Sequence, residues 1–173
     1  MNMKKSTGGF TLIETMIAIT ILTLSIVGPM ITADRAIVAA ETARDQLSAS
    51  YLAQEGIEYM RAVRDDAYLA AYQAGGQSVS ATAWNNFLNG TLSPCISPGS
   101  CTLGSLQSNH TLLLCTVTAC PPIVLETNGT PFSRSIQLVE VGSNEVRITA
   151  SVSWTFHSTP YVVTITDHLT SWQ

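Results

Sequence analysis

The chain has 173 residues and a mass of 18.5 kDa, which leaves room for one domain once a membrane segment is set aside. Charged residues make up only 12%, the mean hydropathy is +0.24 and the formal net charge is −4. An acidic chain of this kind gives no sign of general affinity for nucleic acid, because phosphate binding needs Lys and Arg.

An apolar run extends from Phe10 to about Ala33, and Glu14 is its only charged side chain. A helix of about 24 residues spans about 36 Å, enough to cross a hydrocarbon core of about 30 Å. A lone carboxylate costs about 2 to 3 kcal/mol near the bilayer centre and less near an end, so a retained one usually has a partner or a role. The same helix offers no partner, because the nearest charges are Lys5 and Arg35.

Small residues precede this run instead of following it. An ordinary secretory signal has basic residues, then an apolar stretch, then a small-residue cleavage site. Here Lys4 and Lys5 are followed by Gly8 and Gly9, and only then by the apolar run. Cleavage after Gly9 would therefore remove a short basic leader and leave the hydrophobic helix on the mature protein. Because basic residues stay on the cytoplasmic side, the chain from Asp34 onward is predicted to be exported.

The segment KKSTGGFTLIE, residues 4–14, resembles the prepilin signature of type IV pilins and of the related type II secretion pseudopilins. This resemblance implies that a prepilin peptidase cuts after Gly9 and that Phe10 becomes the N-methylated first residue. It also implies that Glu14 meets the N-terminal amine of a neighbouring subunit during assembly. An ammonium and a carboxylate in an apolar filament core relieve each other, whereas either one alone is penalised. A plain transmembrane anchor is the alternative interpretation.

The pair Gly28-Pro29 lies inside the predicted membrane helix. Proline removes a backbone donor and clashes with the preceding turn, so we expect a kink or a locally melted turn there. Two interpretations of this kink are open. The kink is either a plain structural feature or a hinge that lets the helix extend when it is packed in a filament.

Helical character continues over residues 34–72 as the exposed half of the same helix. An apolar stripe at helical spacing predicts the face that packs on the domain, and its members are Leu52, Gly56, Tyr59 or Met60, Val63 and Ala67. The opposite face, including Glu55, is predicted to be solvated. On that face Glu58 and Asp65 are each close enough to Arg61 to pair with it.

Residues 73–122 form a region rich in Gly, Ser, Asn, Thr and Pro, with poor helix and strand signals, and we expect a variable loop region there. It holds all four cysteines: Cys95, Cys101, Cys115 and Cys120. Four cysteines in an exported part predict disulfides, and three pairings are possible. The two local pairs, Cys95 with Cys101 and Cys115 with Cys120, are favoured because each closes a short loop. A zinc site with His110 is the competing interpretation, although the spacings are loose for one.

Residues 123–173 are typical of an antiparallel sheet. Apolar and polar residues alternate over 146–156, which predicts one buried and one solvated face. Strands at 132–141 and 161–169 flank it across turns at 142–144 and 157–160, and 123–125 is a possible fourth strand. The sheet must cover its apolar face, and the preceding helix is the natural cover.

No catalytic constellation is present in the sequence. His110, His157 and His168 are scattered, without a neighbouring serine motif or paired metal spacing. We therefore expect no enzyme activity, no metal and no cofactor.

The sequence thus predicts an α+β protein with a long N-terminal helix packed on a C-terminal antiparallel sheet of three to four strands. Its parts are a cleaved leader (1–9), a transmembrane or filament-core helix (10–33), the exposed half of that helix (34–72), the loop region (73–122) and the sheet (123–173). Weaker resemblances to minor pilins lie at 52–58 with Arg61 and Arg64, and at 152–154 and 169–172.

The resemblance implies a minor pilin-like subunit of a type IV pilus or of a type II secretion filament. Its expected partners are other pilin subunits, prepilin peptidase, the assembly machinery and membrane lipid, with no direct nucleic-acid binding. We expect a single-pass membrane protein with a cytoplasmic N-terminus and an extracytoplasmic body, which then joins an extracellular filament. The alternative is a membrane-anchored binding or adhesion domain that does not polymerise.

Overall fold

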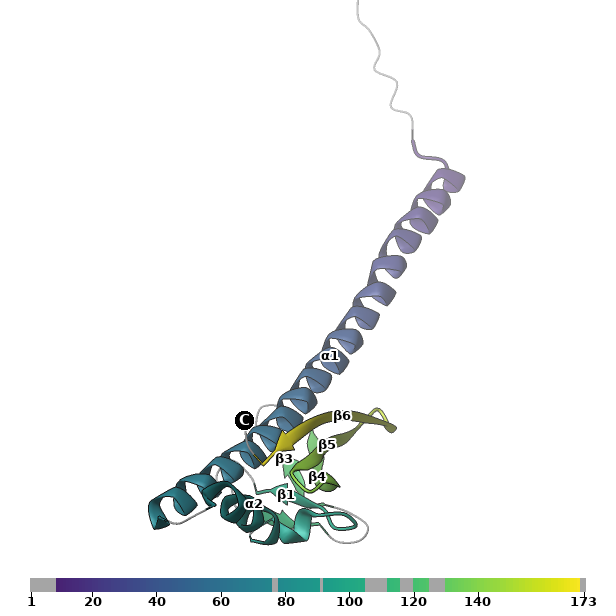
Figure 1. The fold of residues 1–173 in the computed structure, drawn as a ribbon. Helices are drawn as coiled ribbons and strands as arrows, with labels where there is room; N and C mark the ends of the chain where they lie inside the picture. Colours follow the sequence, from purple (N-terminus) through teal and green to yellow (C-terminus); the bar gives the residue numbers. More distant parts are fainter. Residues whose placement is uncertain are drawn as a thin grey trace, which may run out of the picture. The chain divides into compact units, whose positions relative to one another are not determined.

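The computed structural model describes residues 9–75, 78–90, 92–104, 112–115, 120–124 and 130–171. Residues 1–8 of the predicted leader, together with His110, lie outside these ranges. The chain divides into two compact units, Met1–Arg44 and Asp45–Gln173. Helix α1 (Leu12–Ala74) contributes residues to both units (Figure 1).

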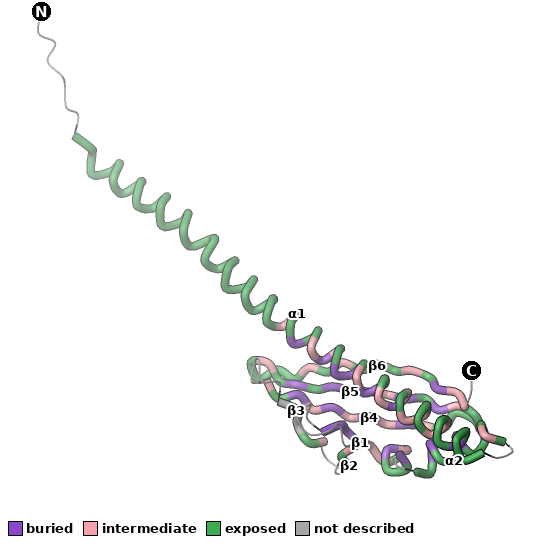
Figure 2. The backbone as a smooth tube through the Cα atoms, turned by 90° about the vertical axis from the view of Figure 1, so that its left-hand side faces the viewer, coloured by how far each residue is buried: buried purple, intermediate pink, exposed green. Residues whose placement is uncertain are grey.

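The described residues of the first unit are residues 9–44, which belong to α1 from Leu12 onward, and almost all of them are exposed, as the green tube in Figure 2 shows. Large apolar side chains are among them; Leu12 is 78% exposed and Leu24 is 75% exposed. A helix that is apolar all round is stable in a membrane or among other apolar helices. By length and composition, this part of α1 is able to cross a membrane, with a mean hydropathy of 2.0 over an 18-residue window.

The helix continues without a break across Gly28 and Pro29. The Thr32 hydroxyl donates to the Pro29 carbonyl oxygen at 2.8 Å, which adds a side-chain hydrogen bond one turn after the proline. The locally melted turn that the sequence suggested is therefore absent, and that part of the prediction is wrong. A Pro ring removes one intrahelical bond, but the flanking bonds keep the helix intact. The kink itself stays a prediction.

The second unit contains the rest of α1 and a six-stranded antiparallel sheet with the strand order β2-β1-β4-β5-β6, in which β3 also pairs with β4. The strands are β1 (Cys101–Leu103), β2 (Leu112–Leu114), β3 (Pro122–Val124), β4 (Pro131–Gly142), β5 (Glu145–Phe156) and β6 (Thr159–Thr170). Strands β4 to β6 are the predicted meander, and β3 overlaps the possible fourth strand. The predicted count of three to four strands is too low, because β1 and β2 join the sheet as well.

One apolar core joins α1 to the sheet, which confirms the predicted α+β class. Leu52, Ile57 and Met60 of the helix belong to the same buried cluster as Ile136 and Ile148 of the sheet. The helix approaches closely at Gly56, where an added Cβ would lie 2.8 Å from the Ile136 Cδ1 atom. The predicted apolar stripe is therefore the face of the helix that covers the sheet.

The turn between β5 and β6 has only two residues, His157 and Ser158, with φ values of 47° and 65°. Two successive positive φ values are typical of a type I′ turn, whose twist matches that of the flanking strands. The sequence had placed Pro160 in this turn, and this is wrong, because Pro160 lies in β6 opposite Thr155. An edge strand accepts proline where the missing N–H would point away from the sheet.

The expected loop region, 73–122, contains more regular structure than its composition indicates. Helix α2 (Val79–Asn89) buries Trp84, Phe87 and Leu88, and the Trp84 Nε1–H donates to the Ser143 carbonyl oxygen at 3.1 Å. The short 3₁₀ helix η1 (Ser93–Cys95) and strands β1 and β2 follow. These elements are three to eleven residues long, and they are held by contacts with distant parts of the chain that a local pattern does not report.

The cysteines form the two local disulfides, Cys95–Cys101 and Cys115–Cys120, with Cα–Cα distances of 5.0 and 4.2 Å. These are the pairings that the sequence favoured. Both sulfurs of the first disulfide are buried in the core, where they join η1 to β1. The competing zinc interpretation fails in this structure, because disulfide sulfurs are not thiolate ligands.

Replacing Cys95 and Cys101 together by Ser is expected to lower the free energy of unfolding by about 2 kcal/mol through loop entropy. Two buried hydroxyls are expected to cost about 1 to 3 kcal/mol more. Urea unfolding of the full chain under oxidising conditions measures the loss. The matched control replaces Cys115 and Cys120, which are only half-buried, and a smaller loss is expected there. Equal losses in the two variants would contradict the structural role of the buried disulfide.

Candidate functional site

Helix α1 begins directly after Thr11, which caps it. The Glu14 backbone N–H donates to Thr11 Oγ1 at 3.3 Å, and the Thr15 N–H donates to the Thr11 carbonyl oxygen at 3.2 Å. A Thr followed three residues later by Glu is the pattern of an N-terminal capping box. Our sequence reasoning gave Thr11 no role, although this spacing is a signal that identifies it. The cap fixes where the helix starts.

Glu14 therefore lies in the first turn of α1, at the positive end of the helix dipole. That position favours a carboxylate by about 0.3 to 1 kcal/mol. Phe10, the predicted new N-terminus, is 82% exposed and lies two residues ahead of the helix. The structure thus places both predicted assembly residues at one end of the first unit. Their predicted contact joins two subunits, so it stays a prediction.

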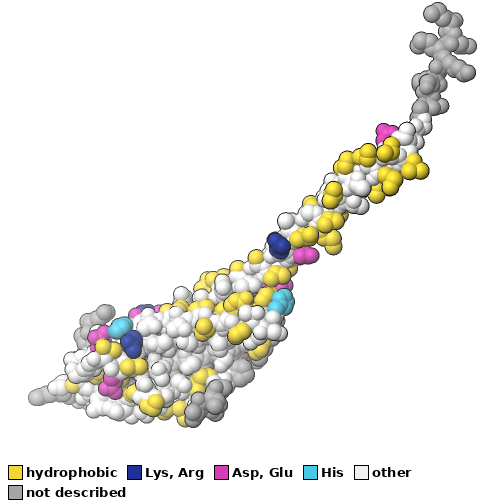
Figure 3. Space-filling view, turned by 90° about the vertical axis from the view of Figure 1, so that its right-hand side faces the viewer, with side chains coloured by type: hydrophobic (Ala, Val, Ile, Leu, Met, Phe, Trp, Pro, Cys, Tyr) yellow, Lys and Arg dark blue, Asp and Glu magenta, His cyan; other side chains and the backbone are white. Residues whose placement is uncertain are grey.

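The remaining polar side chains of the apolar run bond to the helix itself. Each hydroxyl donates to a carbonyl oxygen three or four residues earlier at 2.7 to 2.9 Å, and the donors are Thr15, Thr20, Thr23, Ser25 and Thr32. In lipid an unsatisfied polar group costs several kcal/mol. Because these hydroxyls have partners within the helix, Glu14 is the one strongly polar group of residues 10–33. Figure 3 shows the apolar side chains, in yellow, gathered along this part of the chain.

Residues 4–28 match the model of a known family, described as the prokaryotic N-terminal methylation motif. The chain carries this methylation motif. The match includes the predicted cleavage site between Gly9 and Phe10, as well as Glu14, and it supports the resemblance of this segment to type IV pilins and pseudopilins. The methylation motif and the long apolar helix together suit a single-pass membrane anchor. No curated protein and no solved structure matches the chain significantly.

Away from the methylation motif, the second unit contains a buried arginine that the sequence analysis missed. Arg134 of β4 is 1% exposed, and its Nη1 donates to the Leu52 carbonyl oxygen at 2.8 Å and to Glu55 Oε2 at 2.7 Å. Its Nη2 lies 3.4 Å from the Leu103 carbonyl oxygen of β1. The prediction that Glu55 lies on a merely solvated face is therefore wrong. Arg134 lies two residues from Phe132 and two from Ile136, so strand alternation places it on their buried face, and that spacing is the signal that could have found it.

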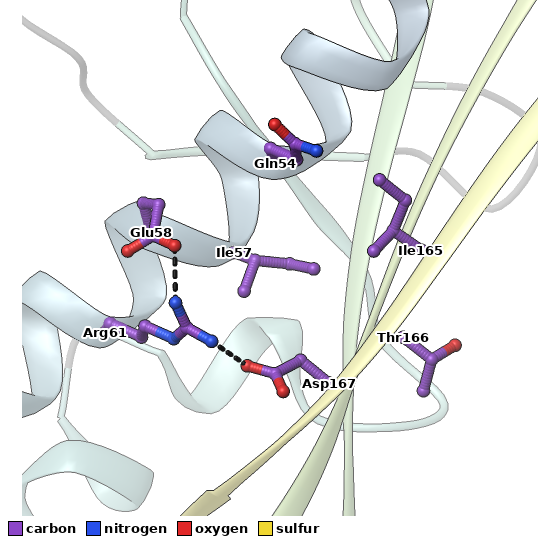
Figure 4. A pocket seen from close by; sticks show the side chains of 7 residues that line it. All are labelled: Gln54, Ile57, Glu58, Arg61, Ile165, Thr166 and Asp167. Atoms are coloured by element: carbon purple, nitrogen blue, oxygen red, sulfur yellow. Dashed lines mark hydrogen bonds and ion pairs between the residues drawn. The ribbon is translucent and has the colours of Figure 1, made fainter.

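Arg61 links α1 to β6 (Figure 4). Its Nη2 donates to Asp167 Oδ2 at 2.6 Å, and its Nη1 pairs with Glu58, as predicted. The predicted pair of Arg61 with Asp65 is wrong, because Asp65 pairs with Arg64 at 2.9 Å. The hydrogen bond that Arg61 donates to Asp167 raises the pKa of Arg61 above its ordinary value. A raised pKa in the folded state gives stability at every pH below the unfolded value, so this contribution is lost only in strong alkali.

His157 and His168 are the two histidines that the structure describes. His168 Nδ1 lies 2.6 Å from Glu145 Oε1, on the opposite face of β6 from Asp167, as strand alternation predicts. His157 lies in the β5–β6 turn and contacts the Phe156 ring. Within the described ranges, no group of three or more His, Cys, Asp or Glu side chains could hold a metal ion.

Proposed function

We propose that this protein is a structural subunit, of the minor pilin type, in a type IV pilus or a related type II secretion filament. The observation that carries the proposal is the position of Glu14. Glu14 is the only charged residue of an apolar run. It lies in the first turn of a helix that starts at Leu12, two residues after Phe10. The methylation motif at residues 4–28 supports the same conclusion.

The steps follow from the chemistry of these residues. Prepilin peptidase removes residues 1–9, and the amine of Phe10 becomes a methylated cation next to an apolar helix. In the membrane this cation stays near the headgroups, because charge is least costly there. In the filament core the amine of one subunit and Glu14 of another neutralise each other, which offsets the cost of burying either charge. The body, from Asp45 onward, faces outward and performs no catalysis.

The alternative is an anchored binding or adhesion domain that stays in the membrane as a single chain. Its supporting observation is the same apolar helix, which anchors a protein whether or not the chain polymerises. The two proposals differ in what happens to the leader, because a plain anchor has no use for cleavage after Gly9.

Mass spectrometry of the mature chain tests the proposal. We expect a chain that begins at Phe10 and carries one added methyl group. The variant Gly9→Leu should keep its leader, because cleavage sites of this kind need small residues. The matched control Ser6→Ala lies in the leader and should be processed normally. A functional wild-type chain that still begins at Met1 would show that the chain is a simple anchor.

A further inference from the structure

Strand β6 forms one edge of the sheet. It pairs with β5 along its whole length, from Thr159 to Thr170, and it is the last strand in the sheet order. Within the part of the chain that the structure describes, no strand pairs with its other side. An open edge of this length is a template for another extended chain.

The two-residue turn fixes which backbone groups face that edge. In such a hairpin Phe156 and Thr159 exchange both of their backbone hydrogen bonds, and the pattern then alternates along the strand. The backbone groups that point away from β5 are therefore those of every second residue, namely Val162, Thr164, Thr166 and His168. Pro160 fits this register, because it also faces outward and lacks an N–H. Ser171 belongs instead to the alternate residues whose backbone groups face β5, and its N–H donates to the Asn144 carbonyl oxygen of the β4–β5 turn at 2.8 Å.

A cavity of about 280 Å³ lies between this edge and α1. It is lined by Gln54, Ile57, Glu58 and Arg61 of the helix and by Ile165, Thr166 and Asp167 of the strand (Figure 4). Ile57 and Ile165 supply apolar surface, whereas Glu58, Arg61 and Asp167 supply charge. A strand added to β6 would place its inward-facing side chains over this cavity, because residues opposite each other in a sheet face the same side.

The cavity has an excess of negative charge. Glu58 and Asp167 share the single guanidinium of Arg61, and each uses only one carboxylate oxygen in doing so. The Glu58 side chain is 65% exposed, so it is open to a second cation. The whole second unit is also acidic, with four Arg against nine Asp and Glu residues, an excess of five negative charges. A cationic side chain would complement the negative charge of this cavity.

We propose that β6 binds an extended segment of a partner protein as an additional strand, and that a Lys or Arg of this segment enters the cavity between α1 and β6. Main-chain bonds to Val162, Thr164 and Thr166 supply the affinity, and the cavity supplies the specificity. The aliphatic stem of the basic residue packs on Ile57 and Ile165, while its charge reaches Glu58. This inference goes beyond the proposed filament role and does not depend on it.

The test uses the full chain in detergent and a synthetic peptide of about seven alternating Thr and Val residues with one central Lys. Fluorescence anisotropy measures the dissociation constant. We expect Thr166→Pro to weaken binding about tenfold or more, because it removes an outward N–H without touching the β5 ladder. The matched control Thr166→Val keeps the N–H and should bind as the wild type does. Glu58→Gln should weaken binding of the Lys peptide but not of a peptide with central Leu.

Amide hydrogen exchange on the wild-type chain supplies a second readout that needs no variant. On adding the Lys peptide, exchange should slow at Val162, Thr164 and Thr166, while strand β4 is unchanged. Equal affinity of Thr166→Pro and wild type would overturn the proposal, as would a Lys peptide that neither binds nor slows exchange along β6. Equal dissociation constants for the peptides with central Lys and with central Glu would show that the cavity does not select a cationic side chain. Processing at Gly9 is unaffected by any of these outcomes, so the two proposals are tested separately.

Discussion

Replacing Glu14 by Leu is expected to abolish incorporation into filaments while leaving the chain anchored in the membrane. The substitution removes a charge from an apolar helix, so insertion becomes more favourable by about 2 to 3 kcal/mol or less. In the filament it leaves the methylated amine of a neighbour unpaired. Removing one partner of a buried ion pair costs about 3 to 5 kcal/mol, which is more than a hundredfold in an equilibrium constant. Immunoblots of sheared filaments and of membranes measure the two fractions.

Two matched variants separate the charge of Glu14 from its place in the helix cap. Glu14→Gln keeps the size of the side chain and loses only the charge, so it should fail in the same way. Thr11→Ala removes the capping hydroxyl at a cost of about 1 kcal/mol to the helix start, but it keeps the carboxylate. We expect this variant to assemble. Normal incorporation of Glu14→Leu would remove the role that we assign to this residue.

Replacing Arg134 by Met is expected to destabilise the second unit by about 3 kcal/mol. The guanidinium is buried against the Leu52 carbonyl oxygen and Glu55, so its loss removes both the ion pair with Glu55 and the hydrogen bond to Leu52. The Glu55 side chain is 29% exposed, which lets it turn partly toward water and keeps the loss below the upper end of the usual range. Urea unfolding of the full chain in detergent, followed by Trp fluorescence, measures the change.

A double variant tests how much of the cost comes from breaking the ion pair by removing only one of its members. Replacing both Arg134 and Glu55 by Met removes the two charges and keeps the apolar volume. Such replacements of a buried pair are often neutral or stabilising. We therefore expect the double variant to recover most of the stability lost in Arg134→Met. If the double variant is as unstable as the single one, packing around the arginine stem, and not the ion pair, holds the helix to the sheet.

The features that sequence reasoning predicted well are those that a local pattern encodes. The apolar run is one contiguous segment, and strand β5 alternates over its whole length, so that Val146, Ile148 and Ala150 share the buried face. The sequence also predicted the apolar stripe of α1, because helical spacing places its members on one face. The favoured cysteine pairs also lie close together in the chain.

What the sequence did not reveal depends on contacts between distant residues. Strands β1 and β2 have three residues each, too few for any periodic signal, and they exist because β1 pairs with β2 and β4. Arg134 was missed because its partners come from a helix about eighty residues earlier and from β1. The choice of Asp167 over Asp65 as the partner of Arg61 likewise depends on how the helix meets the sheet.

The self-satisfied hydroxyls of α1 have a consequence for how such helices would sit against one another. Every Thr and Ser hydroxyl hydrogen between Thr15 and Thr32 is already donated within its own chain, so these side chains have no donor left for an adjacent helix. Two copies of this stretch packed side by side would therefore form no hydroxyl-to-carbonyl hydrogen bonds between chains. In the proposed filament, axial position would then depend on Glu14, the one charged side chain of residues 10–33, and the filament could stretch without breaking bonds between these hydroxyls and a neighbouring chain.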